Sequence, residues 1–344
     1  MYLEHYGLAE LPFRITPHTD FFFAGAKRGA TLDALIYAIT HDEGIVKISG
    51  EVGSGKTMLC RVLMERLPSQ VSIVYLANPS LSREDILFAL ASELGIPAAD
   101  NARTGSVMRA LQEKLVALYA AGRQVVVLID EAHAMPVDTL EEIRLLSNLE
   151  SNRHKLLQLV LFGQPELDTT LARDDIRQLR ERITHHFSLA PLAPEDVAGY
   201  LDFRMRAAGY RGPSVFSPEA IKLIALISQG LTRRINILAD KALLAAFAAG
   251  THQVCTREAK AAIEDARFAD HPAVGRAAKR RRNNVLWALL GALAGALGGA
   301  VAMLAALYFW QSPPGGADRV PPSPATNPSL PGTRPQSGPG TASN

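Results

Sequence analysis

Eight consecutive residues, from Gly50 to Thr57, follow the spacing G-x-x-x-x-G-K-[ST], which is typical of a loop that binds nucleotide phosphates. Glycines such as Gly53 and Gly55 can adopt backbone angles closed to other residues, so successive N–H groups can turn towards one anion. Lys56 would contact the β- and γ-phosphates, and Thr57 would give its hydroxyl to Mg²⁺. The motif predicts a nucleoside triphosphate with Mg²⁺, held by Gly50, Glu51, Val52, Gly53, Ser54, Gly55, Lys56, Thr57 and Met58.

Two acidic residues, Asp130 and Glu131, follow an uninterrupted apolar run at 125–129. A strand that is apolar at every position is typical of the centre of a parallel sheet, and ligands of such sheets bind at the carboxyl ends of the strands. We expect Asp130 to hold Mg²⁺, directly or through water, and Glu131 to orient and polarise the attacking water. The letters at 130–133 also spell a helicase box, which we discount because the chain has neither a second motor core nor the other helicase motifs.

Further candidates follow two other segments. Gln164 comes directly after an apolar run at 156–163, so its amide could contact the γ-phosphate or the attacking water. The alternative is an amide that only forms a turn before Pro165. Arg180 and Arg182 lie downstream, and in an oligomer one of them could reach the γ-phosphate of a neighbouring subunit. The alternative for these arginines is a solvated or salt-bridged helix face.

The elements that must position these residues can be located from apolar patterns. Residues 44–49 form a β-rich run before the phosphate-binding loop, and residues 58–67 keep apolar positions at helical spacing after it. Residues 71–76 form a further strand-like run. Together with the two apolar runs above, these strands predict an α/β fold, a parallel sheet between helices (αβα), across residues 1–190.

Residues 191–268 contain helical patterns only. Ser217 is placed to cap a helix with Pro218 at its first position, and Gly209 and Gly230 end two helices. We expect a small helical lid domain behind the α/β domain.

Composition and charge bound the class of protein. The 344 residues include 36 basic and 34 acidic ones, a net charge of +2, and five of the basic residues lie within 276–282. Without those five the chain is mildly acidic, which makes nucleic acid an unlikely partner. Cys60 and Cys255 form neither a disulfide framework nor a metal site. Residues 1–20 lack the apolar core of a signal peptide.

An uncharged segment of 26 residues, 285–310, follows the basic cluster. At about 1.5 Å per residue it is long enough to cross a bilayer, and aromatic residues stand near both ends. The positive-inside rule then keeps the N-terminal domains in the cytoplasm. We expect a basic juxtamembrane linker at 269–284, one transmembrane helix at 285–310 and a Pro-rich disordered periplasmic tail at 311–344. A buried soluble helix is the alternative for the uncharged segment.

At this level of detail the chain resembles the AAA+ ATPases and, more narrowly, the general secretion pathway protein A family. The resemblance covers about residues 1–268. It is carried by residues 1–8 with Pro12 and Phe13, and by residues 50–57, 128–133, 145–150, 163–167, 178–183, 230–236 and 239–243.

The resemblance implies roles for individual residues. ATP would be the nucleotide, Gln164 would be sensor 1, and Arg233 would be the sensor 2 arginine of the lid. Arg182 would be the arginine finger, which implies a homo-oligomer. Asn78 would be the polar switch that restrains Glu131.

The resemblance also implies a cellular role. The family couples ATP use to assembly of the outer-membrane secretin of type II secretion, with an inner-membrane partner called general secretion pathway protein B. Family members often carry a periplasmic peptidoglycan-binding domain after the membrane span, whereas this chain has the Pro-rich tail there. Related ATPases occur beside pilus and exopolysaccharide export systems, so the pathway stays open.

We therefore expect an inner-membrane ATPase that assembles or remodels a cell-envelope export machine. Two alternatives come from other classes of protein. One is a nucleotide-gated scaffold, in which ATP binding sets the oligomeric state and hydrolysis only resets it. The other is a DNA-associated ATPase, because transposition helper proteins share this core.

Overall fold

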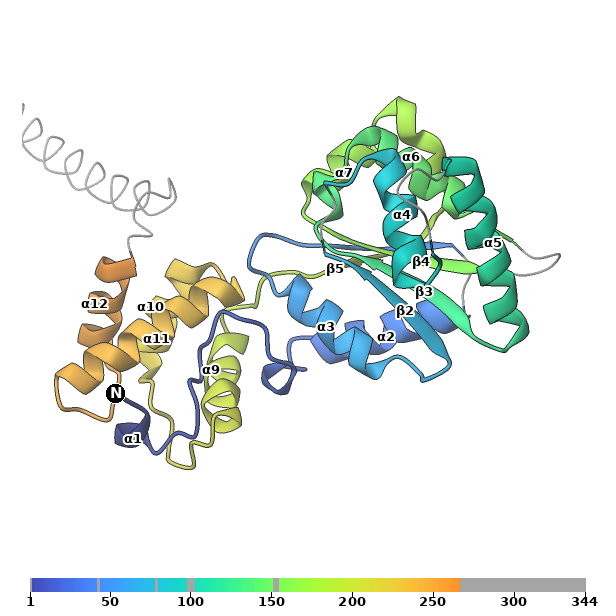
Figure 1. Cartoon of the computed structure of the whole chain (residues 1–344). Helices are drawn as coiled ribbons and strands as arrows, with labels where there is room; N and C mark the ends of the chain where they lie inside the picture. The colour runs from blue at the N-terminus through green and yellow to red at the C-terminus, as the bar shows by residue number, and fades with distance from the viewer. Residues whose placement is uncertain (1, 42–43, 78–79, 98–102, 151–154, 267–344) are drawn as a thin grey trace, which may run out of the picture. The chain divides into compact units, whose positions relative to one another are not determined.

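The computed structural model describes residues 2–41, 44–77, 80–97, 103–150 and 155–266 (Figure 1). The predicted linker at 269–284, the membrane span at 285–310 and the tail at 311–344 lie outside these residues, as does Asn78. None of the described helices combines the length and the apolar character that a bilayer crossing requires. The membrane anchor thus stays a prediction from the sequence.

A five-stranded sheet forms the α/β domain, with the strand order β2-β3-β4-β1-β5. Every pair of neighbouring strands is parallel. The strands are β1 (Ile45–Ser49), β2 (Val71–Leu76), β3 (Gln124–Ile129), β4 (Leu157–Gly163) and β5 (Ile183–Ser188). Parallel strands need crossover connections, so helices cover both faces, and the predicted αβα arrangement is confirmed.

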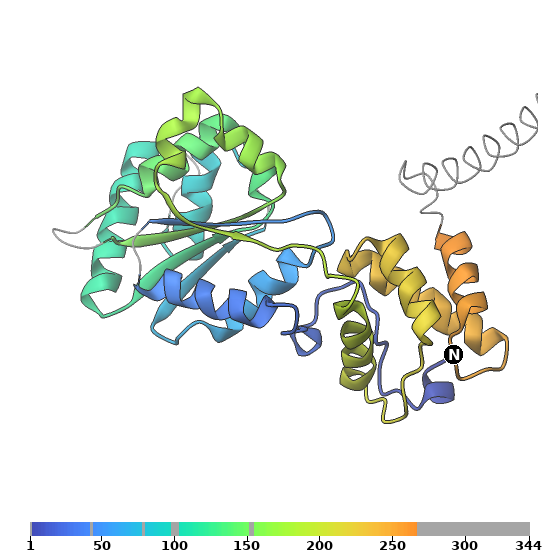
Figure 2. The same ribbon diagram turned by 180° about the vertical axis from the view of Figure 1, so that it is seen from behind.

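The central strands divide their side chains between two apolar cores. On β3, Val125, Val127 and Ile129 enter one core, whereas Val126 and Leu128 enter the other. This two-sided burial explains why the run before Asp130 is apolar at every position. The first core is covered by α4 (Arg83–Glu93), α5 (Thr104–Ala120), α6 (Val137–Leu146), α7 (Glu166–Leu171) and α8 (Arg177–Arg180), and the second by α2 (Arg28–His41) and α3 (Lys56–Arg66) (Figures 1 and 2).

Residues 196–266 form four helices joined by loops, in agreement with the helical patterns of the sequence. Ser217 caps α10 as expected, because its hydroxyl accepts the Ala220 N–H at 3.2 Å and Pro218 occupies the first turn. These lid helices are α9 (Asp196–Ala207), α10 (Pro218–Ser228), α11 (Thr232–Ala248) and α12 (Thr256–Ala266). The remaining described elements are α1 (Tyr2–Tyr6) and the 3₁₀ turns η1 (Thr19–Phe21), η2 (Ala132–Ala134) and η3 (Asp174–Ile176).

The N-terminal segment packs with the lid, although it precedes the sheet in the sequence. Tyr2, Phe13 and Phe21 are buried in the same apolar core as α9–α12. Arg204 of α9 donates from Nε to the carbonyl of Pro12 at 2.6 Å. The first part of the predicted α/β domain therefore contributes to the core of the lid.

Gly230 packs closely against Leu192, in the segment that connects the sheet to the lid. Its φ is +73°, and a Cβ at this position would lie 2.0 Å from the carbonyl oxygen of Leu192. Gly250 has a similar φ of +67°, but no atom lies within 4 Å of its Cβ position. We expect Gly250→Ala to lower the unfolding free energy by about 1–2 kcal/mol, through backbone strain alone. Gly230→Ala should lower it by at least about 2 kcal/mol more, because the Leu192 backbone must also move.

Thermal unfolding of the full chain and of both variants measures this difference. For a protein of this size each kcal/mol shifts the Tm by about 2–4 °C, so Gly230→Ala should melt several degrees below Gly250→Ala. Equal Tm values for the two variants would contradict the close approach to Leu192.

Candidate nucleotide site

The phosphate-binding motif forms the loop between β1 and α3, in the strand–loop–helix frame that the sequence predicts. Gly53 and Gly55 have φ of +79° and +103°, which side chains disfavour, and Gly55 is the N-cap residue of α3. The Ser54 N–H donates to the Glu51 carbonyl at 3.1 Å, so the loop turns back on itself. The positive end of α3 therefore meets the loop, as binding of a phosphate requires.

Lys56 is almost completely buried at the start of α3. Its Nζ donates to the carbonyls of Gly50 at 2.7 Å and Glu51 at 3.1 Å. Burial lowers the pKa of the ammonium, while the nearby carboxylates of Glu131 and Asp130 act in the opposite direction. The loop thus surrounds the Lys56 ammonium with neutral carbonyl oxygens. A charged phosphate oxygen is a stronger hydrogen-bond partner for this ammonium than a neutral carbonyl.

Asp130 is buried at the carboxyl end of β3. Its Oδ1 accepts the Glu131 N–H at 2.9 Å, and its Oδ2 accepts the Tyr75 hydroxyl at 3.4 Å. Burial, together with the adjacent Asp130, raises the pKa of Tyr75 to about 12, so this partner stays a neutral donor. A buried carboxylate with neutral donors is suited to a cation.

The chemistry of these oxygens fits Mg²⁺. Asp130 would supply a carboxylate and Thr57 a hydroxyl, and both are oxygen ligands of the kind that Mg²⁺ prefers. Among the described residues, no group of three or more His, Cys, Asp or Glu side chains could hold a metal ion. Magnesium bound with a nucleotide commonly takes one or two protein ligands and completes its shell with phosphates and water.

Glu131 and Gln164 meet as the parallel sheet predicts. Gln164 follows β4, the neighbour of β3, and its Nε2 donates to Glu131 Oε2 at 3.2 Å. His133 joins them: its Nε2 lies 2.8 Å from Gln164 Nε2, and its Nδ1 lies 3.3 Å from Glu131 Oε2. Sequence reasoning missed His133, because the helicase box that contains it was set aside as a whole.

The lid reaches the phosphate-binding loop through the start of α11. The Thr232 hydroxyl donates to the Gly53 carbonyl at 2.8 Å, and the Arg233 N–H donates to the same oxygen at 3.1 Å. A Cβ on Gly53 would lie 2.8 Å from the Cβ of Arg233, so only glycine permits this approach. The predicted lid arginine therefore lies at the loop, and Thr232 is a contact that the sequence did not indicate.

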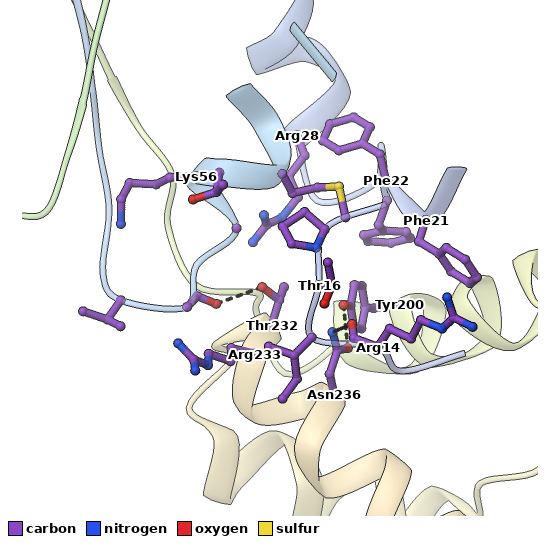
Figure 3. A pocket seen from close by; sticks show the side chains of 18 of the residues that line it. Arg14, Thr16, Phe21, Phe22, Arg28, Lys56, Tyr200, Thr232, Arg233 and Asn236 are labelled. Atoms are coloured by element: carbon purple, nitrogen blue, oxygen red, sulfur yellow. Dashed lines mark hydrogen bonds between the residues drawn. The ribbon is translucent and has the colours of Figure 1, made fainter. Parts of the chain in front are cut away.

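A cavity of about 430 Å³ lies between the phosphate-binding loop, the strand ends that carry Glu131 and Gln164, and the start of α11 (Figure 3). This volume is typical of ligand sites. Its lining includes Lys56, Glu131, Gln164 and Arg233, together with the aromatic side chains of Phe21, Phe22, Phe23 and Tyr200. Charged groups at one part and aromatic groups at another would suit a phosphate chain and a base, respectively.

Arg28 at the start of α2 is a third residue that sequence reasoning missed. Its Nη1 donates to the Ser54 carbonyl at 2.8 Å, and its Nη2 lies 3.5 Å from the Ala190 carbonyl. Burial lowers the pKa of this guanidinium. Arg28 therefore links the phosphate-binding loop to the segment that leads into the lid.

Arg182 lies away from the cavity and from the phosphate-binding loop. It immediately precedes β5, and Ile45 at the start of β1 pairs with Ile183, so Arg182 lies at the sheet edge opposite to the phosphate-binding loop. Its Nη1 donates to Ser147 Oγ at 3.3 Å. At this position the side chain cannot reach a γ-phosphate held by the chain's own phosphate-binding loop.

A model of the AAA domain family matches residues 39–171. General secretion pathway protein A of Aeromonas hydrophila is 41% identical over 254 residues, which cover 74% of this chain and 46% of that protein. The ATP-dependent target DNA activator B of Escherichia phage Mu is 36% identical over 209 residues, which cover 56% of this chain and 63% of that protein. The chain thus spans between about half and two thirds of the length of these curated relatives.

A solved structure with the same fold is the Aeropyrum pernix ORC2 protein, with a TM-score of 0.57, 17% sequence identity and coverage of 74% of this chain and 71% of that one. At this identity the likeness concerns the fold alone, and it agrees with the parallel sheet and loop described above. The extended sequence identity to the Aeromonas protein narrows the assignment further. The family match and this identity together support an AAA+ ATPase of the general secretion pathway protein A family.

Proposed function

We propose that this protein is an inner-membrane ATPase that uses ATP hydrolysis to assemble or remodel a cell-envelope export machine. The observation that carries the hydrolytic part is the convergence of Lys56, Asp130, Glu131 and Gln164 at one edge of the sheet. The relationship to general secretion pathway protein A supports the export role. Secretin assembly in type II secretion, or a related pilus or exopolysaccharide system, is the proposed setting.

The proposed reaction is in-line attack of water on the γ-phosphorus of ATP. Glu131 accepts the proton of the water while the bond between the γ-phosphorus and the bridging oxygen of ADP breaks, which gives ADP and phosphate. Lys56 balances charge on the β- and γ-phosphates, and the amide of Gln164 helps to orient the reacting groups. Asp130 and Thr57 would hold Mg²⁺, which neutralises phosphate charge when it is bound.

Contacts between the lid and the phosphate-binding loop support a role for the lid in sensing the state of the nucleotide. Thr232 and Arg233 both contact the Gly53 carbonyl, so a change in the phosphate-binding loop alters contacts at the start of α11. Arg233 would act as the sensor 2 arginine. We propose that the resulting lid motion passes through residues 269–284 to the membrane span.

Hydrolysis in this scheme needs a second copy of the chain. Arg182 lies at the sheet edge opposite to its own phosphate-binding loop, where a neighbouring subunit could approach it. Its guanidinium would stabilise the transition state on that neighbour, as arginine fingers do. The active form is accordingly a homo-oligomer.

The membrane anchor and the partner rest on sequence and family. The uncharged segment at 285–310 behind the basic cluster supports one span, with the ATPase in the cytoplasm and the tail at 311–344 in the periplasm. A partner that resembles general secretion pathway protein B, held in the same membrane, agrees with this topology.

A DNA-associated function is the second candidate, because the ATP-dependent target DNA activator B of phage Mu is a relative of this chain. The mildly acidic balance outside residues 276–282 opposes it. Salt-sensitive binding of duplex DNA by a fragment that ends near residue 270, and so lacks the basic cluster at 276–282, would favour this alternative.

Two substitutions in the nucleotide site should separate ATP binding from ATP hydrolysis. In the full chain, Lys56→Ala should weaken Mg·ATP binding by more than about 10-fold, because a charge-assisted contact is lost. Glu131→Gln should bind ATP as the wild type does but turn over about 10²- to 10⁴-fold more slowly, because the base is gone. Titration with a fluorescent ATP analogue and a phosphate-release assay measure the two effects.

A rate near that of the wild type for Glu131→Gln would contradict its role as the base. The same variant also tests the driving force in cells. If cells that contain only Glu131→Gln still assemble the export machine, ATP binding suffices and the protein is a nucleotide-gated scaffold.

The second prediction concerns the arginine finger. Arg182→Ala should lower kcat by at least about 100-fold and leave the ATP affinity within about twofold, because the finger acts in trans. Mixing Arg182→Ala with Glu131→Gln should restore part of the activity, since each chain supplies what the other lacks. Arg180→Ala, on the exposed side of the adjacent α8, is the matched control and should retain activity. Failure of the mixture to recover any activity would contradict the shared site.

The third prediction concerns the anchor. The full chain should stay with bacterial membranes after washes with high salt and with alkaline carbonate, because a span of this length partitions into the bilayer. Deletion of residues 285–310 should release it into the supernatant. Release of the unaltered chain by salt alone would overturn the membrane assignment while leaving the ATPase proposal intact.

A further inference from the structure

We propose that His133 is a positioning residue that fixes the amide of Gln164 with its nitrogen towards Glu131. The inference rests on the proposed function, since it concerns the geometry of the hydrolytic base. It also gives a role to the part of the helicase-like box that nucleotide binding alone does not use.

The three side chains close a small ring of polar contacts. Gln164 Nε2 lies 3.2 Å from Glu131 Oε2 and 2.8 Å from His133 Nε2, and His133 Nδ1 lies 3.3 Å from Glu131 Oε2. Gln164 comes from the end of β4, whereas the other two come from the end of β3 and the turn η2. The ring therefore joins two neighbouring strands across the candidate catalytic site.

The donors and acceptors in this ring admit one consistent arrangement. An amide nitrogen carries two hydrogens and only donates, so Gln164 can give one to the Glu131 carboxylate and one to His133. His133 Nε2 must then be the acceptor, which places the imidazole proton on Nδ1. If the amide were reversed, its oxygen would face the carboxylate and lose that hydrogen bond. With its proton on Nδ1, on the side of Glu131, His133 offers only an acceptor at Nε2 and thus selects the amide orientation that serves Glu131.

The second imidazole nitrogen, Nδ1, also helps to hold the Glu131 carboxylate in position. His133 Nδ1 is buried and makes no hydrogen bond within the described structure. It nevertheless lies near the Glu131 carboxylate, whose side chain is 42% exposed. Since an unsatisfied buried donor is unfavourable, a small rotation of Glu131 towards Nδ1 is favoured. Glu131 is consequently held between two donors rather than left to turn into solvent.

The backbone keeps His133 in this place. Glu131 has a φ of +54° and ψ of +34°, so the chain turns sharply at the end of β3. Ala132 is fully buried, and η2 packs against β4 and α7. This turn directs residue 133 back towards the carboxyl end of β4, which Gln164 follows directly. A non-glycine residue in the left-handed region at this point agrees with a functional constraint on the turn.

Kinetics of the full chain, purified in mild detergent, tests the proposal. His133→Phe keeps a ring of similar size without nitrogen and should lower kcat about 10- to 100-fold, with the KM for ATP within about twofold. His133→Gln restores an acceptor and should recover most of kcat. His41→Phe, at the exposed end of α2, is the matched control and should retain wild-type kinetics. Wild-type turnover by His133→Phe would overturn the proposal.

A double-mutant cycle tests whether His133 acts through Gln164. If it does, the variant with both His133→Phe and Gln164→Leu should be no slower than Gln164→Leu alone. Losses that multiply in the double variant would show an independent role and overturn the proposal.

A readout without catalysis separates this inference from the proposed function. In chain labelled with ¹⁵N-histidine, the imidazole signals that His133→Phe removes should show a proton on Nδ1 and none on Nε2. Gln164→Leu should weaken that preference, because only the contact between Nδ1 and Glu131 then favours it. A wild-type His133 that carries its proton on Nε2 would overturn the inference. A wild type that hydrolyses no ATP but shows the Nδ1 proton would instead refute the proposed function alone.

Discussion

Parallel pairing of β1, β3 and β4 is the constraint on which the candidate site depends. Because these strands run in one direction, their carboxyl ends lie at the same end of the sheet. Each of these strands is followed directly by residues of the candidate site. Ser49 pairs with Gly163, so the phosphate-binding loop and Gln164 leave the sheet as neighbours. If any one of these strands were reversed, the polar residues that follow it would lie at the opposite end of the sheet, where Arg182 lies.

The rigidity of this edge comes from the apolar strands beneath it. Leu128 and Ile129 are fully buried, in opposite cores, and fix the point at which Asp130 emerges. Dense packing on both faces leaves the strand ends little freedom, so the functional groups need few additional contacts to hold them. The cost appears as local backbone strain at Glu131, directly after the packed region ends.

Local patterns predicted the part of the site that is encoded within short segments. The phosphate-binding loop needs two glycines, a lysine and a threonine at fixed spacing, and the acid-bearing strand is apolar throughout. Contacts between distant segments have no such local pattern. Arg28 reaches Ser54, and Thr232 reaches Gly53, only because the fold brings α2 and α11 to the loop. Packing of the N-terminal segment against the lid was missed for the same reason.

The path of the chain between the lid core and one of the two cores of the sheet limits how the lid can move. Phe21 and Leu192 belong to the lid core, whereas Leu32 and Leu189 belong to the core beneath the sheet. The chain therefore crosses between the domains twice, and the α/β domain is an insertion between two pieces of the lid. Two tethers define an axis, so relative rotation is restricted to a hinge about the line that joins them. Under the proposed function, such a joint would turn a small change at the phosphate-binding loop into a rotation of the lid in one fixed direction.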